Sequence, residues 1–311
     1  MKTNCTILLL LCWISTFAQS TKFTASEVAV NDLIKGTLYS PENASSKQKL
    51  IILIAGSGPT DRNGNQPGME NNSLKMLAQN LAQHNNAVYA YDKRVIALAK
   101  AGKIDEKTMS FEDYITDAKA VISYFRAKKM YSKIIVAGHS EGSLIGMEAA
   151  KGNADAYISI SGAGRSIDQV IMEQLKGQPQ PVIEEATKYF GLLKEGKTFK
   201  LDDPSMASLF RESVQPYMIS WIKYDPQQEI KDLKIPVLLI NGTKDLQVAV
   251  SEAELLKAAK PDATLKLIPN MNHVLKTIAA GAEENAAAYS KPDLPIDATL
   301  AETVNQFINS L

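Results

Sequence analysis

The most informative segment of the chain is Ile134-Ile135-Val136-Ala137-Gly138-His139-Ser140-Glu141-Gly142. Its apolar first half predicts a buried strand, and its second half has the pattern Gly-x-Ser-x-Gly, which is typical of a tight turn from a strand into a helix. Glycine is required at both flanks because a Cβ at Gly138 or Gly142 would strike neighbouring backbone. Such a turn lifts a serine hydroxyl above the edge of a sheet, so Ser140 is the first candidate for a nucleophile.

The composition is that of an ordinary globular protein. The chain has 311 residues, of which 45% are hydrophobic and 22% charged, and this is enough for one large domain with an inserted subdomain. Lys+Arg and Asp+Glu both total 34, so the formal net charge is 34 − 34 = 0. No long basic run offers a footprint for nucleic acid or lipid headgroups. We therefore expect a small substrate and no nucleic-acid partner, and the composition predicts no oligomeric state.

Residues 1–19 predict a signal peptide. Lys2 precedes an apolar stretch at 7–14, and Thr16-Phe17-Ala18 places small residues at the two positions that a signal peptidase reads. The apolar stretch is well below the roughly 20 residues that span a bilayer. We expect cleavage near Ala18, export to a periplasm or beyond, and no stable membrane anchor afterwards.

The only two cysteines, Cys5 and Cys12, fall within this predicted signal peptide. The mature chain would then contain no cysteine. It would need neither a disulfide nor thiol chemistry.

Apolar runs alternate with helical patterns from about residue 50 onward, which is typical of βαβ units around a mainly parallel sheet. The predicted buried strands lie at residues 50–54, 87–91, 134–137, 156–160, 236–240 and 264–268. The pattern also predicts an antiparallel edge hairpin over 23–40, an amphipathic helix around 74–82, a helix capped by Ser110 and Asp113, and a final helix that buries Leu300, Val304, Phe307 and Leu311. The expected fold class is α/β, with a central sheet flanked by helices.

Residues 164–232 interrupt this alternation with several helical patterns and no convincing strand. They contain 7 of the 21 aromatic residues, namely Tyr189, Phe190, Phe199, Phe210, Tyr217, Trp221 and Tyr224. An inserted helical cap over a core domain of residues 20–163 and 233–311 accounts for both features, because a cap needs a small core and an apolar pocket lining. The alternative for any single aromatic is that it only packs the cap against itself.

A serine hydroxyl needs an imidazole to take its proton. His84 lies near the end of an amphipathic helix far before Ser140, and His139 lies inside the turn, where its side chain should point away from that of Ser140. His273 follows the last predicted strand in Pro269-Asn270-Met271-Asn272-His273, in a loop at the carboxyl edge of the sheet. His273 is the expected base.

The imidazole in turn needs a carboxylate that fixes its tautomer. Asp245 lies just past the strand at 236–240, whose carboxyl end should lie beside the strand that leads to His273. The linear order is then serine, aspartate, histidine. Asp225, Asp232 and Asp262 are weaker rivals and are expected to be solvated charges.

The tetrahedral intermediate needs hydrogen-bond donors aimed at its oxyanion. One expected donor is the backbone N–H of Glu141, directly after the nucleophile, and the other is the backbone N–H of Ser57 in the loop 55–65. A phosphate cradle is the alternative for this loop. It fits neither nucleotide pattern, because Asp61 occupies the third glycine position of Gly-x-Gly-x-x-Gly and no Gly-Lys-Ser/Thr follows.

Together these segments resemble an α/β-hydrolase over nearly the whole mature chain, and the loop Gly56-Ser57-Gly58-Pro59-Thr60-Asp61-Arg62-Asn63-Gly64-Asn65 resembles that of a group of bacterial serine carboxylesterases. The resemblance implies an α/β-hydrolase fold and hydrolysis of small-molecule, short-chain acyl esters by Ser140, Asp245 and His273. It also implies that neither a metal nor a cofactor takes part.

Two other functions remain open. A serine peptidase of the same fold, of aminopeptidase type, would need a cap carboxylate for the substrate ammonium, with Glu173, Glu184, Glu185 and Asp203 as candidates. A non-catalytic binding protein on a hydrolase scaffold is disfavoured because no member of the serine, aspartate and histidine set is missing.

Glu141 is an unexpected acid beside a nucleophile, because its charge would oppose a developing oxyanion. We expect it to turn inward and pair with Arg62 or Arg94. Such a pair would hold the loop of Ser57 against the turn of Ser140.

Overall fold

The computed structural model describes residues 22–42 and 47–311. The predicted signal peptide at residues 1–19, with both cysteines, lies outside the described residues. Within the described ranges, no helix has the length and apolar character needed to cross a bilayer.

Eight strands of the described chain form one sheet in the order β1-β2-β4-β3-β5-β6-β7-β8. The strands are β1 (Phe23–Ala29), β2 (Lys35–Pro41), β3 (Lys49–Ile54), β4 (Ala87–Tyr91), β5 (Lys133–His139), β6 (Ala156–Ile160), β7 (Val237–Gly242) and β8 (Thr264–Ile268). β3 to β8 run parallel, whereas β1 and β2 form an antiparallel hairpin on the edge at β4. The predicted α/β class, its parallel strands and its edge hairpin are confirmed.

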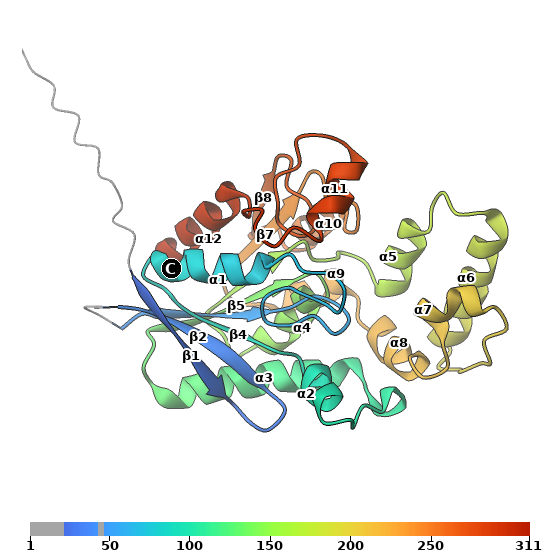
Figure 1. Ribbon diagram of the computed structural model, residues 1–311, viewed down its shortest axis with the longest axis horizontal. Coiled ribbons are helices and arrows are strands. Elements are labelled where there is room, and N and C mark those ends of the chain that lie inside the picture. Colours follow the sequence, from blue (N-terminus) through green and yellow to red (C-terminus); the bar gives the residue numbers. More distant parts are fainter. Residues whose placement is uncertain (1–21, 43–46) are drawn as a thin grey trace, which may run out of the picture.

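Helices cover both faces of the sheet (Figure 1). They are α1 (Ser73–Gln83), α2 (Arg94–Lys100), α3 (Phe111–Lys128), α4 (Glu141–Ala150), α5 (Ile167–Gln174), α6 (Gln180–Lys194), α7 (Ala207–Phe210), α8 (Gln215–Ile222), α9 (Pro226–Glu229), α10 (Val250–Ala259), α11 (Ala282–Ala288) and α12 (Ala298–Ser310), with 3-10 turns η1 (Glu106–Thr108), η2 (Pro204–Met206) and η3 (Ile230–Asp232). Alternate side chains of β3 point to opposite faces. Ile52 and Ile54 pack with α3 and α4, and Ile51 and Leu53 pack with α1 and α12.

The start of α3 and the end of α12 can be compared with the sequence predictions. The capping box that Ser110 forms with Asp113 at the start of α3 is present. In α12, Ile308 is fully buried, whereas Phe307 and Leu311 are only half-buried. The expected burial is confirmed for Leu300 and Val304, whereas Phe307 and Leu311 pack against the same core but are only partly buried.

The segment between β6 and β7 contains helices α5 to α9 and, in the described residues, no strand. In Figure 1, α5 to α8 lie to one side of the sheet. They have an apolar core of their own, in which Tyr189 stacks on Phe199 at 4.3 Å between ring centroids and Phe210 is fully buried. Part of the aromatic content of this segment thus packs the helices against one another.

Candidate active site

Ser140 lies at the turn between β5 and α4 with φ 55° and ψ −122°. This positive φ is costly for a residue with a Cβ, and such strain concentrates at functional sites. A Cβ built on Gly138 would lie 2.0 Å from the carbonyl oxygen of Gly142, and one built on Gly142 would lie 2.4 Å from that of Ile54. The steric reason expected for both glycines is therefore confirmed.

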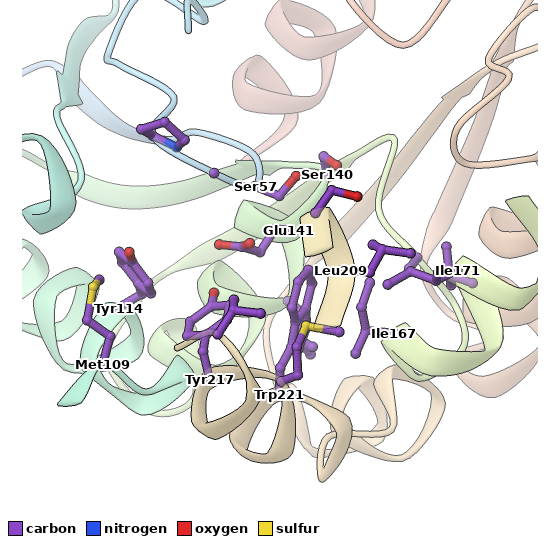
Figure 2. Close-up of a pocket in the computed structure, with 18 of the residues that line it drawn as sticks. Ser57, Met109, Tyr114, Ser140, Glu141, Ile167, Ile171, Leu209, Tyr217 and Trp221 are labelled. Carbon is purple, nitrogen blue, oxygen red and sulfur yellow. The ribbon is translucent and has the colours of Figure 1, made fainter. Parts of the chain in front are cut away.

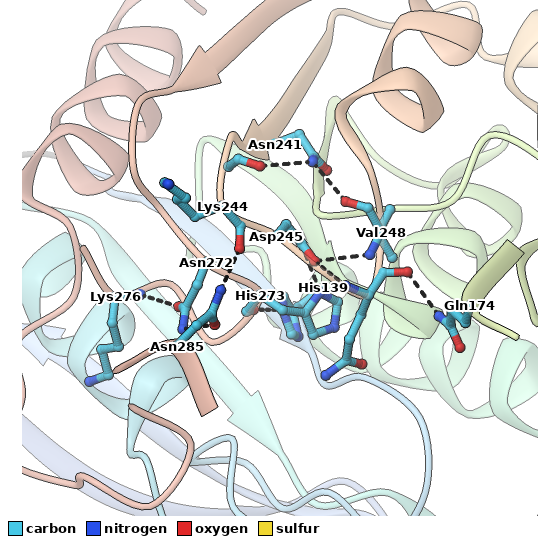
Figure 3. Close-up of polar contacts among 12 residues, drawn as sticks. His139, Gln174, Asn241, Lys244, Asp245, Val248, Asn272, His273, Lys276 and Asn285 are labelled. Carbon is cyan, nitrogen blue, oxygen red and sulfur yellow. Dashed lines mark hydrogen bonds and ion pairs between the residues drawn. The ribbon is translucent and has the colours of Figure 1, made fainter. Parts of the chain in front are cut away.

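Asp245 and His273 meet on the loops that follow two adjacent parallel strands, β7 and β8 (Figure 3). Nδ1 of His273 lies 2.8 Å from Oδ2 of Asp245, and their side chains are 6% and 0% exposed. The other oxygen of Asp245 accepts the backbone N–H groups of Gln247 and Val248, both at 2.9 Å. Burial alone would raise the pKa of Asp245, but His273 and the N–H of Val248 outweigh it, so the pKa is lowered. Asp245 therefore remains an anion that orients the imidazole.

Asn285 on α11 ties these two loops together (Figure 3). Its Nδ2 donates to the carbonyl oxygen of Lys244 at 2.7 Å, and its Oδ1 accepts from Asn272 at 3.0 Å. Lys244 and Asn272 directly precede Asp245 and His273. One buried amide thus holds both loops in register, and no recognised motif in the sequence marked it.

His139 packs directly against His273, with 4.8 Å between ring centroids. Nε2 of His139 lies 2.8 Å from the carbonyl oxygen of His273, so this nitrogen carries the proton and donates it to the bond. Burial, with the neighbouring His273, lowers the pKa of His139 to about 3. His139 is therefore a neutral support of the His273 loop.

The hydroxyl of Ser140 makes no hydrogen bond to His273 among the described residues. Catalytic hydrogen bonds are often long without substrate and tighten only in the complex. The two residues nevertheless meet at one edge of the sheet, because both follow the carboxyl ends of parallel strands.

The loop after β3 passes directly over Ser140. A Cβ built on Gly56 would lie 3.1 Å from the Cβ of Ser140, and Figure 2 shows Ser57, Ser140 and Glu141 together at one end of a cavity. Within the described chain, the backbone N–H groups of Ser57 and Glu141 have no hydrogen-bond acceptor. Glu141 begins α4, and the first N–H groups of a helix lack intrahelical partners and attract negative charge.

Glu141 pairs with Lys93, and the expected pairing with Arg62 or Arg94 is wrong. Nζ of Lys93 lies 2.9 Å from Oε1 of Glu141, and both side chains are 2% exposed. The same Nζ donates to the carbonyl oxygen of Gly56 at 2.8 Å. The expected link between the two segments therefore exists, but Lys93 provides it.

The two arginines have other partners that account for the difference. Arg62 binds Asp92 beside it, and Arg94, the first residue of α2, turns to Asp117 on α3. Of the three cations, only Lys93, which follows β4, has its ammonium buried between Glu141 and Gly56.

The bond from Lys93 to Gly56 also orients Ser57. The carbonyl of Gly56 and the N–H of Ser57 belong to one planar peptide, and in a trans peptide these two groups point in opposite directions. Fixing the carbonyl therefore fixes the direction of the N–H group that was predicted to face the oxyanion.

The cavity beside Ser140 has a volume of about 500 Å³. Its wall below Glu141 is formed by Tyr114, Tyr217 and Trp221 (Figure 2). Of the aromatic residues predicted for the cap, Tyr217 and Trp221 line the cavity and Tyr224 packs against Phe111. The other four, Tyr189, Phe190, Phe199 and Phe210, pack within the helical segment.

Two carboxylates from the described residues line the cavity, and both are paired. Glu141 binds Lys93, and Glu106 binds Arg211 at 2.6 Å. The acids predicted for a substrate ammonium do not line it. Those acids, Glu173, Glu184, Glu185 and Asp203, instead contact neighbouring side chains or cap η2.

The rival carboxylates and the third histidine lie elsewhere. Asp225 caps α9, Asp262 is 75% exposed beside Lys260, and Asp232 is 71% exposed. His84 ends α1 and contacts the carbonyl oxygen of Asn80. None of these residues lines the cavity.

The sequence and the fold are similar to those of known hydrolases. Residues 68–218 match the hydrolase family described as serine aminopeptidase, S33. Esterase EstD of Thermotoga maritima is 26% identical over 259 residues, which cover 81% of this chain; the chain spans about 60% of the length of that relative.

Solved structures share the fold at low sequence identity. Est1E from Butyrivibrio proteoclasticus has a TM-score of 0.56 at 18% identity and covers 92% of this chain and 99% of its own. A dienelactone hydrolase from Anabaena variabilis has a TM-score of 0.52 at 13% identity, with 94% and 98% covered. With its mainly parallel sheet and the turn at Ser140, the chain has an α/β-hydrolase fold.

Proposed function

We propose that the protein is a serine carboxylesterase that hydrolyses small-molecule acyl esters. The observation that carries this proposal is the 2.8 Å bond between His273 and buried Asp245 at the edge of the sheet from which Ser140 projects into the cavity. The similarity to an esterase over 81% of the chain supports the same chemistry.

In this mechanism Ser140 attacks the ester carbonyl while His273 takes its proton, and Asp245 stabilises the imidazolium that forms. The N–H groups of Ser57 and Glu141 receive the oxyanion, and each such donor typically contributes about 10²–10³ in turnover. His273 then gives the proton to the leaving alcohol, and water releases the acyl group from Ser140.

Two measurements test the assignment. A fluorophosphonate probe should label the protein at Ser140, and Ser140→Ala should abolish both labelling and hydrolysis of p-nitrophenyl butyrate without changing thermal unfolding. Wild-type activity in a folded Ser140→Ala variant would refute the nucleophile.

A serine aminopeptidase is the second candidate, because the matched family carries that description. Peptidase and esterase share the acyl-enzyme step, but an aminopeptidase must bind a substrate ammonium. The cavity offers only Glu106 and Glu141 as carboxylates from the described residues, each already bound to a cation. We therefore expect p-nitrophenyl butyrate to be cleaved and alanine p-nitroanilide to be left intact, whereas the reverse preference would establish the peptidase.

The proposal includes residues 164–232 as a cap over the site and export through residues 1–19. Gln174 of α5 donates to the carbonyl oxygen of Gln247, next to the loop of Asp245, so the helical segment contacts the site directly. N-terminal sequencing of protein from an exporting host tests the cleavage expected near Ala18.

A further inference from the structure

We infer that the cavity beside Ser140 binds a neutral hydrocarbon group of the ester. This group is of medium length, longer than the short acyl chains that the resemblance implies. This inference rests on the proposed esterase function for the bond that is cut. The binding of the hydrocarbon itself rests on the cavity alone.

The volume of the cavity exceeds the needs of a small acyl group. Pockets of roughly 300–1,000 Å³ enclose most of a drug-sized ligand, and this cavity has about 500 Å³ and opens directly onto Ser140. An acetyl group would leave most of that space unfilled.

The wall of the cavity is mainly apolar, and its aromatic part is anchored in the protein core. Trp221 of α8 stacks on Phe111 with 5.4 Å between ring centroids and 5° between ring planes, and Phe111 at the start of α3 is fully buried. Tyr217 packs edge-on against Trp221 at 5.8 Å. Because Phe111 belongs to the main core, this wall is formed before any ligand arrives, which reduces the entropy lost on binding.

The charges that line the cavity are balanced, so a charged group gains no partner there. Lys93 binds Glu141, Arg211 binds Glu106, and Arg165 binds Glu252. The phenols stay neutral as well. Burial and the carboxylate of Glu141 raise the pKa values of Tyr114 and Tyr217 well above the usual value.

Leu209 of α7 offers a way to fill the cavity without disturbing the core. It lines the cavity and is half-buried, and in Figure 2 it lies beside Trp221. Leu209→Trp should therefore occupy ligand space at little cost in stability. Met130 is a matched control, because it is 62% exposed and does not line the cavity.

Binding can be measured without catalysis by the fluorescence of Trp221. The chain has two tryptophans, Trp13 and Trp221, so Trp13→Phe in a Ser140→Ala background leaves Trp221 as the sole reporter. Alkan-2-ones carry a carbonyl but no leaving group. We expect 2-decanone to change the emission saturably and to bind at least about 100-fold more tightly than 2-butanone, because each buried methylene is worth about fourfold.

Kinetics with two ester series then assign the hydrocarbon to one side of the scissile bond. A rise in kcat/KM from p-nitrophenyl acetate to octanoate, by up to about fourfold per methylene, places the acyl chain in the cavity. A rise confined to a series of alkyl acetates places the alcohol there. Either result is expected to shift to shorter chains in Leu209→Trp and to be unchanged in Met130→Trp.

Two negative results are distinguishable. The hydrocarbon site is refuted, even if esters are hydrolysed, by either of two results. One is equal affinity for both ketones, and the other is a preference for ester chain length that is the same in Leu209→Trp as in the wild type. Tight binding of 2-decanone without hydrolysis of any ester and without fluorophosphonate labelling supports the site and refutes the esterase.

Discussion

Replacing Lys93 by Met should destabilise the fold and slow catalysis through two separate contacts. Met has a similar length but carries no charge and no donor. The substitution leaves Glu141 without its cation and the carbonyl oxygen of Gly56 without its bond at 2.8 Å.

The expected loss of stability follows from burial. Both side chains of the pair are 2% exposed, and removing one partner of a buried ion pair typically costs about 3–5 kcal/mol. Replacing both partners by apolar residues of similar size is often neutral. Lys93→Met/Glu141→Met should therefore be more stable than Lys93→Met, and urea unfolding measures this coupling.

The effect on catalysis should differ from the effect on stability. In both variants Gly56 lacks its donor, so the N–H of Ser57 is no longer held in one direction, whereas the N–H of Glu141 remains whatever its side chain. We expect kcat to fall by up to about 10²-fold in the single variant and to stay low in the double variant. The assay is hydrolysis of p-nitrophenyl butyrate below the unfolding transition.

Lys260→Met is a matched control. Lys260 is 8% exposed but pairs with Asp262, whose side chain is 75% exposed. A surface partner returns to solvent when its cation is removed, so the cost should stay within about 1 kcal/mol and kcat should not change. The reasoning about Lys93 is refuted if Lys93→Met matches this control in both measurements, and recovery of kcat in the double variant refutes the orientation of Ser57.

Three further predictions concern other parts of the site. Asp245→Asn should lower kcat by about 10³–10⁴-fold while circular dichroism stays native, and retention of more than a tenth of the activity would exclude Asp245 as the carboxylate. Gly138→Ala should lower the free energy of unfolding by several kcal/mol because its Cβ meets the carbonyl oxygen of Gly142. Gly191→Ala, in open space on α6, should raise it by about 0.5–1 kcal/mol. Equal melting temperatures of the two variants contradict this prediction. The pKa of His139 is lowered to about 3, so between about pH 6.5 and 3 this residue takes up a proton only in the unfolded chain. Wild-type stability therefore falls as the pH drops through this window, and the stability difference between the wild type and His139→Gln should narrow on the order of 2 kcal/mol between pH 7 and 4.5. A constant difference in urea titrations contradicts the shift.

The sequence predicted the sheet well because burial leaves a local pattern. β3, β5 and β6 are buried on both faces and are therefore continuous apolar runs, and the capping box of α3 lies within four consecutive residues. The Gly-x-Ser-x-Gly turn is equally local. The positions of Asp245 and His273 could be predicted because parallel strands bring their carboxyl ends to one edge.

The partner of Glu141 could not be predicted in the same way. Arg62 and Lys93 lie in loops and Arg94 begins α2, and the choice among them depends on which side chain reaches Glu141 and Gly56. Local sequence carries no signal for that choice. The distribution of cap aromatics between the helical core and the cavity wall depends on tertiary packing in the same way.

The supports of the site share one geometric principle. Lys93 donates to the carbonyl oxygen of Gly56, His139 to that of His273, and Asn285 to that of Lys244. The donors are separated from these acceptors by 37, 134 and 41 residues along the chain. Every residue carries a main-chain carbonyl whatever its side chain, so the acceptors leave no trace in the sequence.

Each of these bonds fixes a peptide plane at the predicted site. A planar peptide couples a carbonyl to the next N–H group, so a buried donor on one side sets the direction of the residue on the other side. Gly56 and Lys244 directly precede Ser57 and Asp245, and the bond from His139 holds His273 itself. The geometry of the site is thus set by donors that act on the backbone of the site, and substitutions of these donors should alter kcat more than KM.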